Sequence, residues 1–119
     1  MSNKVSLIVY PVADLAAATK LYTVLLGTEP AFASEQYVSF RVADQEIGLA
    51  PAAEAYAKGT PIVYVEAADI EAALAALVEA GATKRQGVTD MGWSKIALVA
   101  DPDGNVIGLR TTPNWGQQG

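Results

Sequence analysis

The sequence contains neither cysteine nor histidine among its 119 residues. The absence of cysteine excludes disulfides, thiolate nucleophiles and zinc-thiolate sites. The absence of histidine removes the commonest general base, the usual imidazole metal ligand and every nucleophile pair that depends on imidazole. Acid-base chemistry, if the chain performs any, has to use other side chains.

Positive charge and long apolar runs are also scarce. The net charge of -5 argues against a nucleic-acid partner, because a phosphate backbone needs a basic face. Charge, proline or glycine interrupts each apolar stretch, so no segment is long enough to cross a bilayer, and the N-terminus lacks an export signal. The length and the 51% hydrophobic content suit one compact domain, 1–119, which we expect to be soluble and cytoplasmic.

An internal repeat organises what is present. Residues 7–27 read LIVYPVADLAAATKLYTVLLG, and residues 62–81 read IVYVEAADIEAALAALVEAG. Asp14 and Asp69 stand where a helix N-cap belongs, and Gly27 and Gly81 where the chain leaves a helix with positive φ. The apolar residues recur at helical spacing, which predicts one core-facing stripe on each helix: Leu15, Ala18, Leu21, Tyr22, Leu25 and Leu26, then Ile70, Ala73, Leu74, Leu77 and Val78.

Short alternating runs follow each helix and predict strands over 31–33, 37–42 and 46–50, then over 83–86, 95–100 and 106–111. The pattern strand, helix, three strands therefore occurs twice. We predict an α+β fold of two tandem βαβββ modules, 4–50 and 62–112, joined by a linker over 51–61 and followed by a tail over 113–119.

Alternation assigns the strand residues to two faces. One face is apolar and should receive the helices: Val38, Phe40, Val42, Ile47, Leu49, Val63, Val65, Ile107 and Leu109. The other carries aromatics, charges and glycines: Tyr37, Ser39, Arg41, Glu46, Gly48, Ile62, Tyr64, Glu66, Gly108 and Arg110. This second face is a candidate ligand surface, although opposed charges on an exposed sheet face are also explained as solvated pairs.

The stretch DPDGNVIGLR, residues 101–110, allows two interpretations. Asp101 and Asp103 could begin a cation loop, but a calcium loop needs more oxygen ligands and a closing glutamate, and position 112 is threonine. Proline followed by glycine between two apolar runs instead indicates a hairpin turn. Gly108 is then unusual, because it lies inside a strand.

The paired modules resemble the vicinal oxygen chelate superfamily, which includes glyoxalase I, extradiol dioxygenases and bleomycin-resistance proteins. The resemblance covers residues 4–112, and VADLAAATKLYTVLLG and ADPDGNVIGL carry its most specific motifs. It implies curved mixed sheets that enclose a cup-shaped cavity, with one metal ligand on each of four strands. Those four positions are Leu7, Gly48, Ile62 and Gly108, and none carries a donor atom in its side chain, so we expect neither metal nor cofactor.

The resemblance therefore implies the branch of the family that binds drugs without altering them. We expect a homodimer in which one module of each chain builds the cup, and a planar aromatic ligand such as an antibiotic. The predicted ligand-binding residues are Leu7, Tyr37, Ser39, Arg41, Glu46, Gly48, Ile62, Tyr64, Glu66, Trp93, Gly108 and Arg110.

Three alternatives stay open. The chain could be an enzyme that works without metal, with Glu46 or Glu66 as general base in a lyase or isomerase reaction. It could also be a vestigial domain with an oligomeric or regulatory role. Trp93 follows a glycine in a hairpin loop, and packing on a dimer partner explains it as well as ligand contact does.

Overall fold

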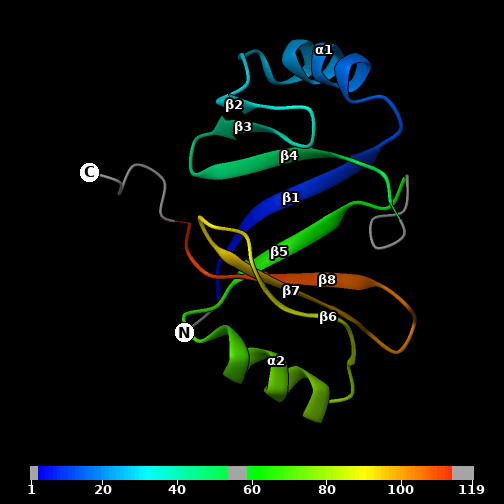
Figure 1. Cartoon of the computed structure of the whole chain (residues 1–119), viewed down its shortest axis with the longest axis vertical. Coiled ribbons are helices and arrows are strands. Elements are labelled where there is room, and N and C mark those ends of the chain that lie inside the picture. The colour runs from blue at the N-terminus through cyan, green and yellow to red at the C-terminus, as the bar shows by residue number, and fades with distance from the viewer. Residues whose placement is uncertain (1–2, 54–58, 114–119) are drawn as a thin grey trace. The chain divides into compact units, whose positions relative to one another are not determined.

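The computed structural model describes residues 3–53 and 59–113. The chain divides into two compact units (Figure 1): Ser6–Ile62, called the first unit, and Val63–Gly119 together with Met1–Val5, called the second unit. The centre of the predicted linker, 54–58, and the end of the predicted tail, 114–119, lie outside the described residues. No helix within the described ranges is long and apolar enough to cross a membrane.

The first unit contains β1 (Val5–Val12), α1 (Leu15–Leu26), β2 (Phe32–Ala33), β3 (Val38–Val42) and β4 (Gln45–Pro51). Its strands lie in the order β2-β3-β4-β1. β4 pairs parallel to β1 and antiparallel to β3, and β2 pairs antiparallel to β3.

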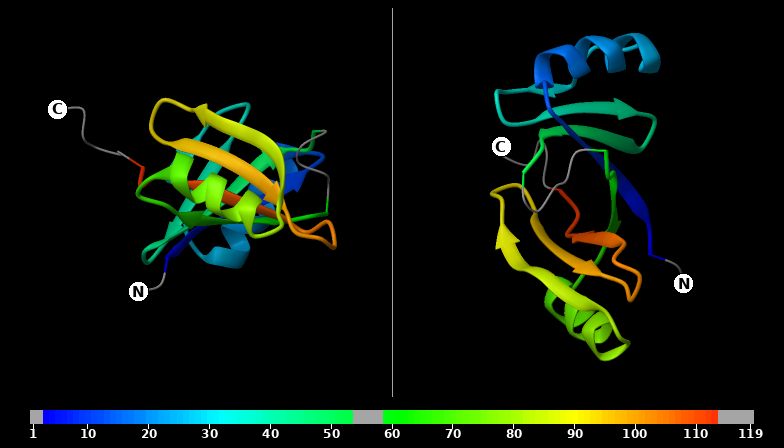
Figure 2. Two further views of the ribbon diagram at one scale, coloured as in Figure 1. Left: turned by 90° about the horizontal axis from the view of Figure 1, so that it is seen from below. Right: turned by 90° about the vertical axis from the view of Figure 1, so that its right-hand side faces the viewer.

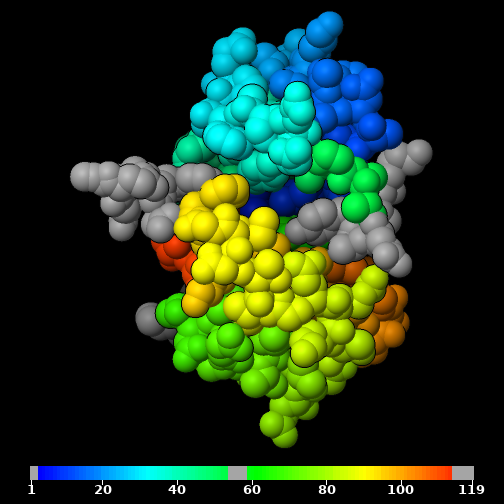
Figure 3. Space-filling view, in the orientation of Figure 1, coloured from blue at the N-terminus to red at the C-terminus, as the bar shows by residue number. Residues whose placement is uncertain are grey.

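The second unit repeats this plan with β5 (Ile62–Glu66), α2 (Ile70–Glu79), β6 (Thr83–Asp90), β7 (Lys95–Ala100) and β8 (Val106–Arg110). The order β5-β8-β7-β6 places β5 where β1 lies in the first unit, again parallel to its neighbour. The predicted α+β fold of two βαβββ modules is therefore confirmed. β6 is four residues longer than expected from the sequence, and two register shifts interrupt its pairing with β7. It forms the outer edge of its sheet and appears in yellow in Figure 3.

The caps confirm the predicted start of both helices and the predicted end of α1, whereas the C-cap of α2 is Ala80, one residue before the predicted Gly81. Asp14 Oδ1 accepts a hydrogen bond from the Ala17 N–H at 3.0 Å, and Asp69 Oδ1 accepts one from the Ala72 N–H at 3.1 Å. Each bond satisfies a backbone donor that has no partner within the helix. Gly27 follows α1 with φ 70°, in the left-handed region that glycine adopts without strain.

Each helix covers the apolar face of its own sheet (Figure 2). In the first unit the buried residues Val38, Phe40 and Leu49 form the core, and Leu15, Ala18, Tyr22 and Leu26 of α1 pack on it. In the second unit the core is Ile70, Leu74, Ala97, Val99 and Leu109, with Ala73 and Leu77 packed against it. Val42 and Val63 were expected on this face but are exposed, so the helices leave the ends of the strands uncovered.

The predicted stripe on α1 is partly wrong. Leu21 and Leu25 are 61% and 67% exposed, and neighbouring Val24 is 82% exposed. A helix of 3.6 residues per turn cannot direct all of its apolar residues to one sheet, and α1 carries more of them than a single stripe holds. Val78 of α2 also faces outward, at 46% exposure.

Candidate functional site

A buried carboxylate lies at the centre of the first unit's predicted site residues. Glu46 on β4 is only 1% exposed. Its Oε2 accepts hydrogen bonds from the Tyr37 hydroxyl at 2.9 Å and the Ser39 hydroxyl at 2.8 Å. Ser39 comes from the neighbouring strand β3, and Tyr37 immediately precedes that strand. The two hydroxyl donors offset the free-energy cost of removing the carboxylate from water. Glu46, Tyr37 and Ser39 therefore form a satisfied, buried hydrogen-bonded cluster.

Tyr37 also covers Gly48, which stands opposite Ser39 in the pairing of β3 with β4. A Cβ atom added at Gly48 would lie 2.7 Å from Cε1 and 2.8 Å from Cζ of the Tyr37 ring, and closer still to its hydroxyl. These distances are shorter than van der Waals contact. Glycine at position 48 is therefore required by the ring that lies against it.

The second unit contains the same arrangement. Tyr64 on β5 stands opposite Gly108 on β8 in the parallel register. A Cβ atom at Gly108 would lie 2.5 Å from Cε2 and 2.7 Å from Cγ of the Tyr64 ring. This explains the unusual strand glycine in DPDGNVIGLR, because only a residue without a side chain leaves space for that ring.

These rings change the interpretation of the two glycines. Gly48 and Gly108 were predicted as ligand-binding residues, and a strand glycine leaves the backbone open to a planar ligand. In the structure, tyrosines of the same chain occupy both approaches. Tyr64 is 1% exposed, so a ligand that reaches Gly108 has to displace this ring first.

The charged residues of the predicted site differ in accessibility. Arg41 is exposed although it stands opposite Glu46 in the register, whereas Arg110 is buried and stands opposite Glu66. Glu66 is half-buried, and its Oε1 accepts a hydrogen bond of 3.3 Å from the Thr112 hydroxyl. Of the two predicted general bases, Glu66 is therefore the more accessible.

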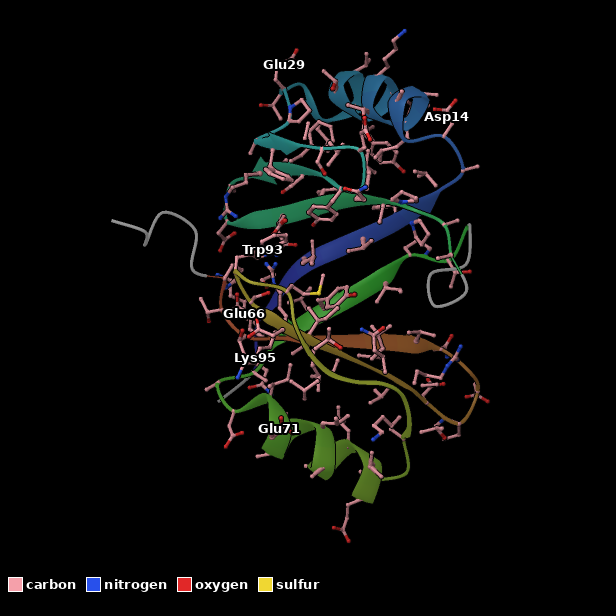
Figure 4. All side chains as sticks on the ribbon, viewed as in Figure 1. Asp14, Glu29, Glu66, Glu71, Trp93 and Lys95 are labelled. Carbon is pink, nitrogen blue, oxygen red and sulfur yellow. The ribbon has the colours of Figure 1, made fainter. Side chains whose placement is uncertain are left out.

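Trp93 lies apart from these residues. It follows the β6–β7 turn at Gly92, whose φ is 99°, and lines a groove of about 480 Å³ with the start of α2 and the residues that follow β8. Figure 4 shows Trp93, Lys95 and Glu71 along the same side of the second unit. Lys95 and Glu71 were missed from the sequence, because the groove combines three elements that lie far apart in the chain.

The aspartate turn is confirmed as a turn. Asp101 Oδ1 accepts hydrogen bonds from the N–H groups of Asp103 and Asn105, both at 2.9 Å. Asp101 Oδ2 accepts a third from the Asn105 side-chain amide at 2.9 Å, and this bond is the main cause of the lowered pKa of the Asp101 carboxyl. The carboxylate is thus directed into its own loop instead of toward a cation.

The metal ion implied by the resemblance does not fit the residues present. Leu7 and Ile62 are buried apolar side chains, and tyrosine rings occupy the space beside Gly48 and Gly108. A metal site that takes one side chain from each of four strands needs carboxylate, imidazole, thiolate or other donor groups, and none of these four side chains supplies one. Among residues 3–53 and 59–113, no three histidine, cysteine, aspartate or glutamate side chains group closely enough to hold a metal.

Comparison with known proteins identifies relatives of the fold. Residues 4–109 match the family Glyoxalase, described as the Glyoxalase/Bleomycin resistance protein/Dioxygenase superfamily. No curated protein sequence matches the chain.

Three solved structures are similar. A hypothetical protein from Bacillus halodurans C-125 has a TM-score of 0.79 and 12% identity, over 98% of this chain and 99% of that one. The NAD-dependent benzaldehyde dehydrogenase from Legionella pneumophila has a TM-score of 0.73 and 19% identity, over 88% and 96%. A glyoxalase/bleomycin resistance protein/dioxygenase superfamily member from Vibrio splendidus 12B01 has a TM-score of 0.68 and 15% identity, over 93% and 100%. At these identities the likeness shows the fold alone.

Proposed function

The chain belongs to the glyoxalase/bleomycin resistance protein/dioxygenase superfamily, and on that premise we propose that it binds a small planar aromatic molecule, such as an antibiotic, without a metal ion. The bound molecule is sequestered and not altered. The observation that carries this proposal is the Glu46 cluster, a hydrogen-bonded carboxylate on the sheet face that the helices leave free. Ligand pockets are mostly apolar with a few fixed polar groups, and this face has that composition.

The neighbours of the cluster support a binding role over a catalytic one. Leu7 stands opposite Glu46 in the β1–β4 register and is buried. The apolar side chain of Leu7 therefore lies next to the polar Glu46 cluster on the same face of the sheet. Glu46 Oε2 already accepts two hydrogen bonds, whereas a general base needs a lone pair directed at the substrate. Within the second unit, considered by itself, Arg110 is also buried, and its guanidinium suits a carboxylate or phenolate group.

The proposal is tested by titrating the purified protein with a panel of planar aromatic drugs and following tryptophan fluorescence. Metal content is measured on the same sample. We expect one or more compounds to bind to metal-free protein, and the variant Ser39→Ala to weaken binding by about tenfold through loss of an ordered donor. Stoichiometric zinc, nickel or iron contradicts the metal-free proposal, and no response from any compound contradicts the binding proposal.

A second candidate is a metal-free lyase or isomerase with Glu66 as base. The partial exposure of Glu66, together with the long 3.3 Å hydrogen bond from Thr112, favours this residue over Glu46. Proton abstraction next to a carbonyl exchanges hydrogen for deuterium in heavy water. If deuterium exchanges into a bound ligand with the parent protein but not with Glu66→Gln, the enzymatic proposal would replace the binding proposal.

We also propose a homodimer in the cytoplasm. The exposed Leu21, Val24 and Leu25 give α1 an apolar outer stripe, and an apolar stripe on a helix indicates contact with another surface. Sedimentation at several concentrations measures the assembly state. A monomer at micromolar concentration would exclude the dimer, and imaging of the tagged protein tests the location.

A further inference from the structure

The groove beside Trp93 lies on a different side of the sheet from the proposed binding face. Lys95 is separated by two and four residues along β7 from the core residues Ala97 and Val99, so its side chain lies on the same face as theirs. This is the face that α2 covers. Asp90 stands opposite Lys95 in the β6–β7 register and shares that side. Gly108, by contrast, stands opposite Leu98 and faces away from the helix. The groove is therefore a separate place from the face proposed above.

An equivalent groove in the first unit serves as an internal comparison. It lies between the start of α1 and the β2–β3 segment and measures about 490 Å³, against about 480 Å³ for the groove beside Trp93. The hollow itself is thus a consequence of the βαβββ plan. The lining differs, because the first groove is formed largely by apolar residues such as Leu15, Ala16 and Val38, with one acidic residue, Glu35.

The second groove has a tryptophan and an excess of negative charge. Asp69, Glu71 and Asp90 line it with a single positive residue, Lys95. Asp69 caps α2, and Asp90 Oδ1 accepts a hydrogen bond from the Gly92 N–H at 2.9 Å, which holds that carboxylate at the hairpin. Glu71 is exposed in the first turn of α2.

We propose that this groove binds an aromatic molecule that carries a protonated amine. The Trp93 ring offers a face for stacking and for attraction of the cation, and the carboxylates of Glu71 and Asp90 receive the ammonium group. Lys95 and the hydroxyl groups of Thr111 and Thr112 supply donors for a hydrogen-bond acceptor elsewhere on the molecule. The groove shares no residue with the Glu46 cluster, so the two sites can be tested independently.

The experiment uses two planar tricyclic compounds, the cation 9-aminoacridine and the anion 9-anthracenecarboxylate. Their dissociation constants are measured by equilibrium dialysis with the full chain and with variants. We expect Glu71→Gln and Asp90→Asn each to weaken 9-aminoacridine by about twofold to fivefold, as exposed charges do. Trp93→Ala should weaken it by about tenfold, and 150 mM added salt should weaken it further.

The matched control is Glu35→Gln, which removes the same charge from the equivalent groove of the first unit. It should leave the affinity for 9-aminoacridine unchanged. Neither Glu71→Gln nor Asp90→Asn should weaken 9-anthracenecarboxylate. The inference is overturned if 9-aminoacridine does not bind to the parent protein. It is also overturned if Glu71→Gln and Asp90→Asn bind 9-aminoacridine as tightly as the parent, or if Glu35→Gln weakens this binding as much as they do. Binding of the anion that responds to Ser39→Ala alone would then still support the proposed function.

Discussion

The two units place a tyrosine ring on a strand glycine by different routes. In the second unit, Tyr64 covers Gly108 directly across the parallel strand pair. The residue that occupies the position of Tyr64 in the first copy of the repeat is Val9, and it stands opposite Gly48 in the same way. The ring over Gly48 instead comes from Tyr37, next to the other neighbouring strand. Both glycines therefore face a tyrosine ring, but the two rings come from neighbouring strands on opposite sides of the glycine strand. A comparison of the two sequence copies does not reveal this difference.

The contacts of the two rings also differ. A side chain at Gly48 would meet the hydroxyl end of Tyr37, which is half-buried. A side chain at Gly108 would meet the base and edge of the Tyr64 ring, which is buried. A ring can move its tip by a small rotation, but its base moves only with the backbone. The second unit should therefore tolerate change at its glycine less well.

The largest contrast is expected between the two helices. Leu74→Ala in α2 removes a residue that packs on Ala97, Val99 and the rest of the second core, and should lower the free energy of unfolding by about 3 kcal/mol. Leu25→Ala in α1 removes a side chain that is exposed in the single chain, and at concentrations where the chain is monomeric it should change the free energy of unfolding by less than about 0.5 kcal/mol. Urea unfolding of the two variants measures both values. Equal losses would show that the outer stripe of α1 is covered in solution.

The next largest contrast concerns the glycines. Gly108→Ala should lower the free energy of unfolding by about 2 to 3 kcal/mol, because the buried Tyr64 ring has to shift. Gly48→Ala should lower it by about 1 kcal/mol, because the tip of the half-buried Tyr37 ring can move and thereby weaken its hydrogen bond to Glu46. Urea unfolding of both variants tests the order, and a larger loss at position 48 would contradict it.

Double variants sharpen the same comparison. In a Tyr37→Phe background the added methyl at position 48 no longer meets a hydroxyl, so Gly48→Ala should cost less than it does alone. In a Tyr64→Phe background the cost of Gly108→Ala should be unchanged, because its contacts are with ring carbons. A smaller cost of Gly108→Ala in the Tyr64→Phe background would contradict the proposed difference between the two tyrosine contacts.

A third contrast concerns the hairpin turns and depends on pH. The Asn105 amide, followed by backbone N–H groups, holds the pKa of Asp101 below its ordinary value. A depressed pKa contributes stability that is present above the unfolded-state pKa of about 3.9 and is lost as pH falls through the folded-state pKa. Asp101→Asn should therefore be less stable than the parent at neutral pH, and the difference should close below about pH 4.

Asp103→Asn is the matched control for this turn. It removes the same charge, but Asp103 contributes only its backbone N–H to the loop. Urea unfolding across pH 3 to 7 should show no comparable loss for this variant. An equal loss would mean that the net charge, and not the hydrogen bonds of Asp101, sets the effect.

The smallest effect is expected at the equivalent turn of the first unit, where Ala43 has φ 57°. A non-glycine residue is strained in this region, so Ala43→Gly should raise the free energy of unfolding by about 0.5 kcal/mol. Gly104 adopts φ 89° in the turn of the second unit. Gly104→Ala should therefore lower the free energy of unfolding by about 1 kcal/mol. Thermal unfolding of both variants measures these opposite signs.

Much of the fold follows from local signals in the sequence. The N-cap aspartates and the glycine after α1 act within one helical turn, and alternation assigns Phe40 and Leu49 to the core without knowledge of their partners. The exposure of Leu21 and Leu25 could not be foreseen, because α1 has apolar residues on more than one side and periodicity does not choose between them.

The site was less predictable for a physical reason. Glu46 and Ser39 share a face by alternation, but the hydrogen bond that the Ser39 hydroxyl donates to Glu46 depends on the strand register, which the sequence alone does not supply. Alternation over the predicted strand 37–42 assigned Tyr37 to this face, but Tyr37 lies outside β3, so its contact with Glu46 depends on local backbone geometry that alternation does not describe. The groove of Trp93 combines residues from three elements that are separate in the chain.

The pairing of Tyr64 with Gly108 has an evolutionary consequence. A carboxylate introduced at position 108 alone would collide with the ring, and removal of the ring alone would leave a cavity in a buried face. Each single substitution is therefore deleterious in the presence of the other native residue. A larger residue at position 108 therefore requires a compensating change at position 64, so the two positions restrict the substitutions that each can accept.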